Sequence, residues 1–345
     1  MATMRCVVVR EHGGFDRVRL EEREVPTPLP GQVRVRMQAV GLNHLDTWVR
    51  RGVPGHTFPL PLVLGSDGCG VVDAVGRTVA NVRAGDEVVV LPGVSCGACE
   101  PCQSGVDQLC RQYHILGESC DGTAAEYVCL APANVAPKPI GLPAPEAASI
   151  CLVFLTAWNM LVRRAALRAG ETVLVHAGLS GVGSAAVQIA HVLGAQVIAT
   201  AGGPQKCDLV RALGASHVLD YLTTDFAGEV RKITGKQGVD VVFEHVGAAT
   251  FEGSLRCLAR GGRLVTCGAT TGGAVSISLH QVFFKSLSIL GSTMGSKGDL
   301  RRILQLVGQG RLRPVLDRTL PLAQAAEGHR LLEQRQAMGK IALLP

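Results

Sequence analysis

Short runs of apolar, β-branched residues alternate with proline and glycine over the first 130 or so residues. The runs lie at Cys6–Val9, Val33–Val40, Gly70–Val75, Glu87–Leu91 and Ala125–Leu130, with breakers such as Pro26-Thr27-Pro28 in between. Apolar runs bounded by turn residues are typical of β-strands. The pattern therefore predicts a β-rich first domain.

The pattern changes near residue 145, where Pro145 opens a helical stretch that runs through Leu155 and ends near Gly170. Beyond it, predicted strands alternate with helices. The strands lie at Thr172–His176, Gln196–Thr200, His217–Leu219, Val239–Glu244, Arg263–Thr266 and Ser288–Leu290. Strands that are apolar throughout and alternate with helices are typical of a parallel sheet covered on both faces.

The last fifty residues are predicted to hold two more helices and a strand. One helix opens at Ser296, has Asp299 three residues on, and stops at Gly310. Serine followed by an acid three residues later is typical of a helix start, and glycine of a helix end. The terminal strand is Lys340–Leu344.

Length and composition narrow the class of protein. A chain of 345 residues exceeds one comfortable core, so two domains are expected, and 47% hydrophobic with 18% charged residues describes a globular protein. The net charge of +6 is mild and unclustered, which slightly favours anionic small molecules and gives little support to nucleic-acid binding. We see no membrane-spanning apolar run and no secretory leader, and expect a cytoplasmic protein without membrane or nucleic-acid partners.

Four cysteines with the spacing C-x2-C-x2-C-x7-C are the most specific motif, namely Cys96, Cys99, Cys102 and Cys110. Four thiolates this close can surround one tetrahedral Zn²⁺, and an all-sulfur shell leaves the metal no open position for chemistry. The alternative is a pair of disulfides, which a long chain without a leader does not need. The motif predicts one structural zinc.

A glycine-rich turn follows the predicted strand Thr172–His176. It has the spacing G-x-S-x-x-G, with Gly178, Ser180 and Gly183 at the marked positions and a helix after it. Such a strand-to-helix turn offers free N–H groups, here around Gly181 and Val182, and a positive helix end to a pyrophosphate. Alone the motif is weak, but among several strand–helix units it predicts a dinucleotide site.

The next predicted strand bears on the choice of cofactor. NAD sites usually place an acid about 20 residues beyond the glycines. Here Ala201-Gly202-Gly203 follows the strand, Lys206 lies just beyond, and Tyr221 follows the third strand. A missing carboxylate with a nearby lysine favours the 2′-phosphate of NADPH over NADH. The alternative is that Lys206 is a solvated helix residue.

Together these motifs resemble the zinc-type medium-chain dehydrogenase/reductase superfamily, in its quinone-oxidoreductase-like branch, over essentially the whole chain. The resemblance implies an α/β protein. A GroES-like β-rich catalytic domain (1–152 and 295–345, with a zinc lobe near 93–112) would be joined to a Rossmann doubly wound parallel-sheet domain (153–294). It also implies a homodimer or higher homo-oligomer joined near Leu287–Thr293. Leu155–Trp158 resembles the family helix whose threonine, here Thr156, lies against the nicotinamide. Val246 and Gly268 complete the implied cofactor contacts, and His44 is a candidate for the pyrophosphate.

The departures from that family concern the catalytic zinc. Gly41–Asp46 and Leu64–Gly68 resemble the segments that carry two zinc ligands, but Asn43 and Ser66 stand at the ligand positions and Asp67 at the adjoining acid. Leu152 stands at a third. Catalytic zinc needs three protein ligands and an open position, so we expect none. Asn43 is a candidate for orienting the nicotinamide amide or the substrate carbonyl, and Ser66 and Asp67 for lining the cleft. The alternative for Asn43 is a structural turn residue.

Without a Lewis acid, reduction of a plain ketone loses its main source of charge stabilisation, whereas reduction of a C=C bond conjugated to a carbonyl is less demanding. We therefore predict an NADPH-dependent reductase of enones, quinones or enoyl thioesters. A short enoyl-CoA would fit the mild positive charge and Arg50-Arg51. The alternatives are an alcohol dehydrogenase with an atypical metal site and a non-catalytic NADPH-binding protein.

Overall fold

The computed structural model describes residues 2–345; residue 1, with which the first predicted domain segment begins, lies outside the described residues. The chain divides into two compact units, Met1–Leu152 with Ser296–Pro345, and Val153–Gly295. The second predicted boundary, between residues 294 and 295, lies one residue before the observed boundary between Gly295 and Ser296. The first boundary, between Leu152 and Val153, lies inside one helix, α4 (Cys151–Trp158).

The first unit is built on strands, as its apolar runs predict. Its strands are β1 (Thr3–Val9), β2 (Arg19–Glu24), β3 (Val33–Gly41), β4 (Leu62–Val63), β5 (Asp67–Val75), β6 (Glu87–Val90), β7 (Gly93–Val94), β8 (His114–Ile115), β9 (Tyr127–Leu130), β10 (Val135–Pro137), β17 (Leu316–Pro321) and β18 (Lys340–Leu344). Its helices are η1 (Phe15–Arg17), α1 (His44–Arg51), α2 (Glu100–Gln103), η2 (Asp107–Leu109), η3 (Pro132–Asn134), α3 (Ala144–Ala147), α10 (Lys297–Gly308), η5 (Leu322–Gln324) and α11 (Ala325–Glu333).

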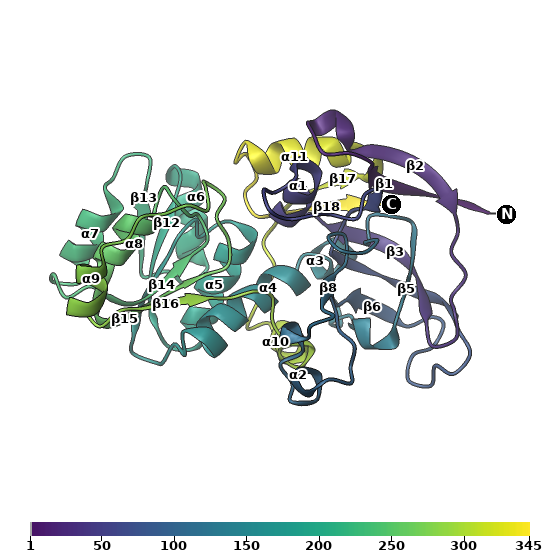
Figure 1. Cartoon of the computed structure of the whole chain (residues 1–345), viewed down its shortest axis with the longest axis horizontal. Helices are drawn as coiled ribbons and strands as arrows, with labels where there is room; N and C mark the ends of the chain where they lie inside the picture. The colour runs from purple at the N-terminus through teal and green to yellow at the C-terminus, as the bar shows by residue number, and fades with distance from the viewer. Residues whose placement is uncertain (1) are drawn as a thin grey trace. The chain divides into compact units, whose positions relative to one another are not determined.

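The main sheet of this unit has the order β10-β6-β5-β3-β18-β17, with β9 also paired to β3. In β3 the side chains alternate: Val33, Val35 and Met37 are buried, while Arg34 and Arg36 are not. That period of two is what a strand needs to face a core on one side. The last strand of the chain, β18, lies between β3 and β17, so both ends of the sequence build this sheet (Figure 1).

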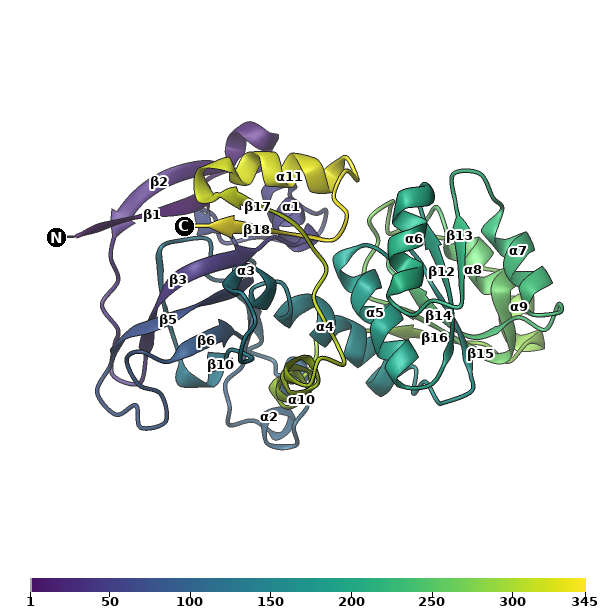
Figure 2. The same cartoon turned by 180° about the vertical axis from the view of Figure 1, so that it is seen from behind.

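The second unit is a parallel sheet with helices on both faces. Its strands are β11 (Thr172–Val175), β12 (Gln196–Ala201), β13 (His217–Asp220), β14 (Val239–Glu244), β15 (Leu258–Thr266) and β16 (Ser288–Gly291). Its helices are α5 (Gly181–Val192), α6 (Pro204–Ala212), α7 (Phe226–Ile233), α8 (Phe251–Cys257) and α9 (Leu279–Phe284). The strand order β13-β12-β11-β14-β15-β16 is that of a Rossmann sheet. Within this unit α5 and α6 cover one face and α7, α8 and α9 lie on the other (Figure 2).

The long helical stretch differs from its prediction in two ways. It is broken into α3, α4 and a π-helix, η4 (Asn159–Arg164), rather than running unbroken to residue 170. The span Ala144–Arg164 is also long and apolar enough to cross a membrane, with a mean hydropathy of 1.4, which corrects the expectation that no run reaches that length. Because 72% of it is buried, as in the core helix of a folded domain, it is weak evidence for a membrane span.

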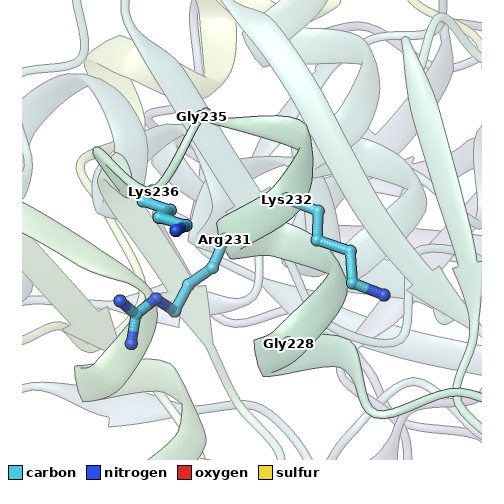
Figure 3. A pocket seen from close by; sticks show the side chains of 5 residues that line it. All are labelled: Gly228, Arg231, Lys232, Gly235 and Lys236. Carbon is cyan, nitrogen blue, oxygen red and sulfur yellow. The ribbon is translucent and has the colours of Figure 1, made fainter.

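A shallow hollow of about 530 Å³ lies on the second unit, at the end of α7 (Figure 3). Gly228, Arg231, Lys232, Gly235 and Lys236 line it, and Lys232 pairs with Glu229 at 2.5 Å. Basic side chains at the last turn of a helix complement its dipole. Since α7 ends where the chain turns back into β14, the hollow lies at the edge of the sheet opposite the dinucleotide turn. The helix dipole of α7 thus accounts for the basic residues that line the hollow.

Candidate functional site

The first unit contains a buried cluster formed by Asn43, Asp67 and Lys340. The Lys340 ammonium lies 2.5 Å from Asn43 Oδ1 and 3.2 Å from Asp67 Oδ2, and it donates to the Leu42 carbonyl at 2.7 Å. The Asn43 amide nitrogen donates to Asp67 Oδ2 at 3.0 Å. Asp67 is fully buried, and Asn43 and Lys340 are each 4% exposed.

The sheet brings these three residues together from distant parts of the chain. Gly41, at the end of β3, pairs with Asp67 of β5 on one side and with Ala342 of β18 on the other. Lys340 is the first residue of β18 and Asn43 is the N-cap of α1, directly after β3. The hydrogen-bond ladder, and not any local motif, therefore places the ammonium between the two other side chains.

Every hydrogen of the Asn43 amide and of the Lys340 ammonium has an acceptor within the protein. Besides Asp67, the Asn43 amide nitrogen donates to Gly41 O at 3.2 Å. The other oxygen of Asp67 accepts the backbone N–H of Leu152 at 2.7 Å.

Asp46 fixes the segment that carries Asn43. Its carboxylate accepts the Asn43 N–H at 2.7 Å and the Gly65 N–H at 2.9 Å, joining α1 to the segment before β5. The pKa of Asp46 is raised to about 6, because the effect of burial exceeds the opposing effect of the two backbone donors. Ser66, fully buried, donates its hydroxyl to Leu116 O at 2.7 Å. His44 is the first residue of α1 and is half-buried.

In the second unit, the glycine-rich turn adopts the geometry that its sequence predicts. Ala177 has a φ of +45°, and Ser180 caps α5 by accepting the Gly183 N–H at 3.0 Å. A Cβ on Gly183 would lie 2.2 Å from Ala177 O, so only glycine allows this approach. First-turn N–H groups lack acceptors within the helix, so those of Gly181 and Val182 face a potential anion. The turn fits a pyrophosphate.

The residues after β12 and β13 pack on each other. A Cβ on Gly202 would lie 2.6 Å from the Tyr221 hydroxyl, so the tyrosine covers this glycine. Asp220 Oδ1 accepts the N–H groups of Gly203 and Leu222, each at 3.0 Å. Asp220, which the sequence analysis did not single out, therefore fixes the loop that is predicted to hold the ribose. Lys206 lies in the first turn of α6.

The remaining predicted cofactor residues lie at other points of this unit. Val246 follows β14, and its carbonyl accepts the N–H and hydroxyl of Thr271 at 2.8 and 2.7 Å. Gly268 follows β15, and its carbonyl accepts the Thr266 hydroxyl at 3.3 Å. Thr156 lies in α4 and is 7% exposed.

The four predicted zinc ligands converge. The sulfur atoms of Cys96, Cys99, Cys102 and Cys110 all lie within 4.8 Å of one another. Three of the S–S distances are 3.4, 3.5 and 3.9 Å. Tetrahedral zinc with Zn–S bonds of about 2.3 Å requires separations of about 3.8 Å. Backbone N–H groups of Ala98 and Cys99 lower the pKa of Cys96 to about 6, which favours the thiolate. The donor set fits Zn²⁺.

The zinc lobe is also tied to the returning chain. Asp107, between the third and fourth cysteines, accepts the backbone N–H of Lys297 at 3.0 Å and its ammonium at 3.2 Å. The same ammonium donates to Ser95 Oγ at 2.8 Å. Lys297 is the first residue of α10, so the lobe holds the start of that helix.

One of the two arginines considered for a substrate anion is buried inside the first unit. Arg50 is 1% exposed, forms an ion pair with Glu333, and stacks on the ring of Phe15 with its guanidinium carbon 4.4 Å from the ring centroid. A buried, paired guanidinium is not available to a substrate anion. Of the doublet Arg50-Arg51, Arg50 is therefore turned inward, whereas Arg51 is exposed.

Comparison with known proteins gives concordant matches. Residues 29–140 match the family described as alcohol dehydrogenase GroES-like domain, and residues 181–309 match zinc-binding dehydrogenase. A quinone oxidoreductase from Pseudomonas aeruginosa is 34% identical over 97% of this chain and 97% of its own. A 2-haloacrylate reductase from a Burkholderia species is 32% identical over 99% of this chain and 98% of its own. A solved structure described as an NAD-dependent alcohol dehydrogenase is 51% identical, with a TM-score of 0.95, covering 99% of this chain and 100% of that one.

Proposed function

Because the chain belongs to the zinc-binding medium-chain dehydrogenase/reductase superfamily, which shows it to be a nicotinamide-dependent oxidoreductase, we propose that it reduces a C=C bond conjugated to a carbonyl group, or a quinone, with NADPH and without a catalytic zinc. The observation that carries the proposal is the position of Lys340. Its buried ammonium lies within 3.2 Å of both Asn43 and Asp67, in the segments that resemble the zinc-ligand segments of the family.

A fixed ammonium at this position opposes binding of a divalent cation. Lys340 repels a second cation and neutralises Asp67, the carboxylate that lies beside it. The hydroxyl of Ser66 is committed to Leu116 O, and Leu152 contributes only a backbone N–H to the cluster. A catalytic zinc needs three protein ligands and an open position, and these residues do not supply them.

The chemistry that needs no Lewis acid is addition of hydride to an activated double bond. The bound nicotinamide would supply the hydride, and negative charge would develop on the substrate carbonyl oxygen. The residues of this chain that would hold the cofactor are those of the first turn of α5 and of the loop fixed by Asp220. Both amide hydrogens of Asn43 are donated within the protein, to Asp67 and to Gly41 O, so Asn43 has none left for a substrate carbonyl.

We propose NADPH over NADH on two features. No carboxylate follows β12, where Ala201, Gly202 and Gly203 stand, and Lys206 lies in the next helix turn. Asp220, at the end of β13, accepts two backbone N–H groups through its Oδ1. Titration of the protein with each cofactor separately tests this: NADPH should bind at least tenfold more tightly, and equal or tighter NADH binding contradicts the assignment.

The reaction is tested by NADPH oxidation with quinones, enones, 2-haloacrylate and short enoyl-CoA esters. Turnover with at least one of them, at one zinc per chain by metal analysis, is the expected result. No turnover with any of them overturns the proposal. Tight NADPH binding without turnover would instead indicate a non-catalytic NADPH-binding protein.

The alternative with separate support is an alcohol dehydrogenase, since the 51% identical structure is described as one. It predicts a second bound metal per chain and oxidation of alcohols with NAD. Because the two functions differ in metal content as well as in substrate, metal analysis of the purified protein separates them before any substrate is found.

A further inference from the structure

Polar side chains with no assigned role lie buried at the carboxyl edge of the Rossmann sheet. His176 follows β11, Thr200 lies in β12, Glu244 ends β14, and Thr250 and Ser254 lie at the cap and within α8. His176 and Thr200 are 1% and 2% exposed, and Glu244 and Ser254 are fully buried. We call these five residues the buried relay, because hydrogen bonds connect them in sequence.

One arrangement of protons satisfies the centre of the relay. The Ser254 hydroxyl donates to Glu244 Oε2 at 2.8 Å, because a carboxylate can only accept. His176 Nε2, 2.9 Å from Ser254 Oγ, must then be the donor of that contact. Burial lowers the pKa of His176 to about 4, so the ring is neutral at pH 7 and its Nδ1 accepts. Thr200, 3.3 Å away, supplies that hydrogen bond.

At one end the relay holds the glycine-rich turn. Thr200 Oγ1 accepts the Ala177 N–H at 3.1 Å, and its backbone carbonyl accepts the Gly178 N–H at 2.7 Å. Ala177 has a left-handed backbone, which a residue with a side chain adopts only when its surroundings fix it. Thr200 thus fixes the start of the turn that is expected to bind the pyrophosphate.

At the other end the relay holds the loop after β14. Glu244 Oε1 accepts the N–H groups of Val246 and Gly247 at 2.7 and 3.1 Å, and the Thr250 hydroxyl lies 2.8 Å from Oε2. Although burial opposes ionisation, these donors and His176 lower the pKa of Glu244. The loop carries Val246, one of the residues expected to contact the cofactor.

We propose that the buried relay positions the glycine-rich turn and the loop of Val246 with respect to each other, with Thr200, His176, Ser254 and Glu244 as positioning residues. The proposal rests on the proposed function only for the identity of the bound nicotinamide cofactor. A break at any link frees either the pyrophosphate turn or the loop of Val246, so either break weakens binding of the whole dinucleotide.

Binding measurements on four variants test this. Thr200→Val and Ser254→Ala should each weaken NADPH binding about tenfold by fluorescence titration, and the double variant about as much as one of them, because both break the same connection. Thr200→Ser keeps the hydroxyl and should bind like the parent. Singles within twofold of the parent, or a double effect equal to the product of the two, would overturn the proposal.

The matched control is Thr234→Val. The Thr234 hydroxyl also accepts a backbone N–H, that of Gly238 at 3.0 Å, and donates to a carbonyl, that of Val230 at 2.8 Å, but it lies at the opposite edge of the sheet. It should lower the melting temperature and leave NADPH affinity unchanged. If it weakens binding as much as Thr200→Val does, the effect is general destabilisation and the proposal fails.

A second measurement needs no cofactor and no turnover. ¹⁵N spectra of the histidine rings at pH 7 should show His176 neutral, with the proton on Nε2, and Ser254→Ala should change that signal. A charged ring or a proton on Nδ1 refutes the relay. Because binding and ring spectra are read without substrate, lack of reductase activity does not affect either result.

Discussion

Replacement of Lys340 by methionine removes the ammonium and leaves Asp67 as an unpaired buried carboxylate. Lys340 is 4% exposed and Asp67 is fully buried, and removing one partner of such a pair costs about 3–5 kcal/mol. For a unit of this size each kcal/mol lowers the melting temperature by about 2–4 °C, so a decrease of about 6–20 °C is expected. The first unit, to which both residues belong, should be the part of the protein that loses stability.

The assay is urea unfolding followed by tryptophan fluorescence. The chain has two tryptophans, Trp48 in α1 of the first unit and Trp158 in α4, so a Trp158→Phe background makes Trp48 the reporter of the unit that carries the cluster. The matched control is Lys138→Met: Lys138 pairs with Glu87 at 3.2 Å, but Glu87 is 54% exposed. An exposed pair contributes at most about 1 kcal/mol.

A double variant separates charge from packing. Lys340→Met with Asp67→Asn leaves no unpaired charge, and the Asn43 amide can rotate to present its oxygen, so most of the lost stability should return. The reasoning is refuted if Lys340→Met is no more destabilising than Lys138→Met. It is refuted equally if the double variant is no more stable than the single one, since the buried charge would then not be the cause.

Three further predictions follow from other features. Removal of zinc by a chelator should speed hydrogen exchange in the lobe and also at the start of α10, because Asp107 holds Lys297; unchanged exchange in α10 would contradict the coupling. Burial lowers the pKa of His329 to about 3, below that of the unfolded chain, so the unfolded state takes up the proton first. His329 should therefore contribute a fall in the unfolding free energy of about 1.4 kcal/mol per pH unit between about pH 6.5 and 3, and the slope measured for His329→Leu should be smaller by that amount. We expect a dimer through β16, the edge strand of the Rossmann sheet, beside which Phe284 is 65% exposed; Phe284→Glu should shift sedimentation to the monomer, and an unshifted dimer places the interface elsewhere.

The elements that the sequence predicted are those whose own residues carry the signal. The central strands of the Rossmann sheet, β11, β12 and β14, are buried over most of their length, and Ser296 caps α10 by accepting the Asp299 N–H at 3.1 Å. Strand β2 was missed because its sequence, Arg19–Glu24, is almost wholly charged and its side chains are largely exposed. Only its ladder with β1 makes it a strand, and a ladder partner is invisible in a local pattern.

The candidate site divides in the same way. The glycine turn and the cysteine quartet are local in sequence, so their spacing predicts their geometry. Lys340 was not predicted, because a lysine that opens a strand is usually solvated and its partner Asp67 lies 273 residues earlier. The polar contacts of Asp220 and of the buried relay depend likewise on neighbouring strands. Their signal is tertiary, and periodicity in one segment does not contain it.

The pairing of β18 with β3 has a consequence for how the protein is made. During synthesis at about 5–20 residues per second, the 273 residues between Asp67 and Lys340 correspond to roughly 14–55 s. Throughout that interval the nascent Asp67 lacks its Lys340 counter-charge and β3 lacks one of its neighbours, and residues 153–295 are completed before the interval ends. The domain whose sequence begins first is thus the last to finish, and the demand for chaperones should fall on the first 152 residues of the nascent chain.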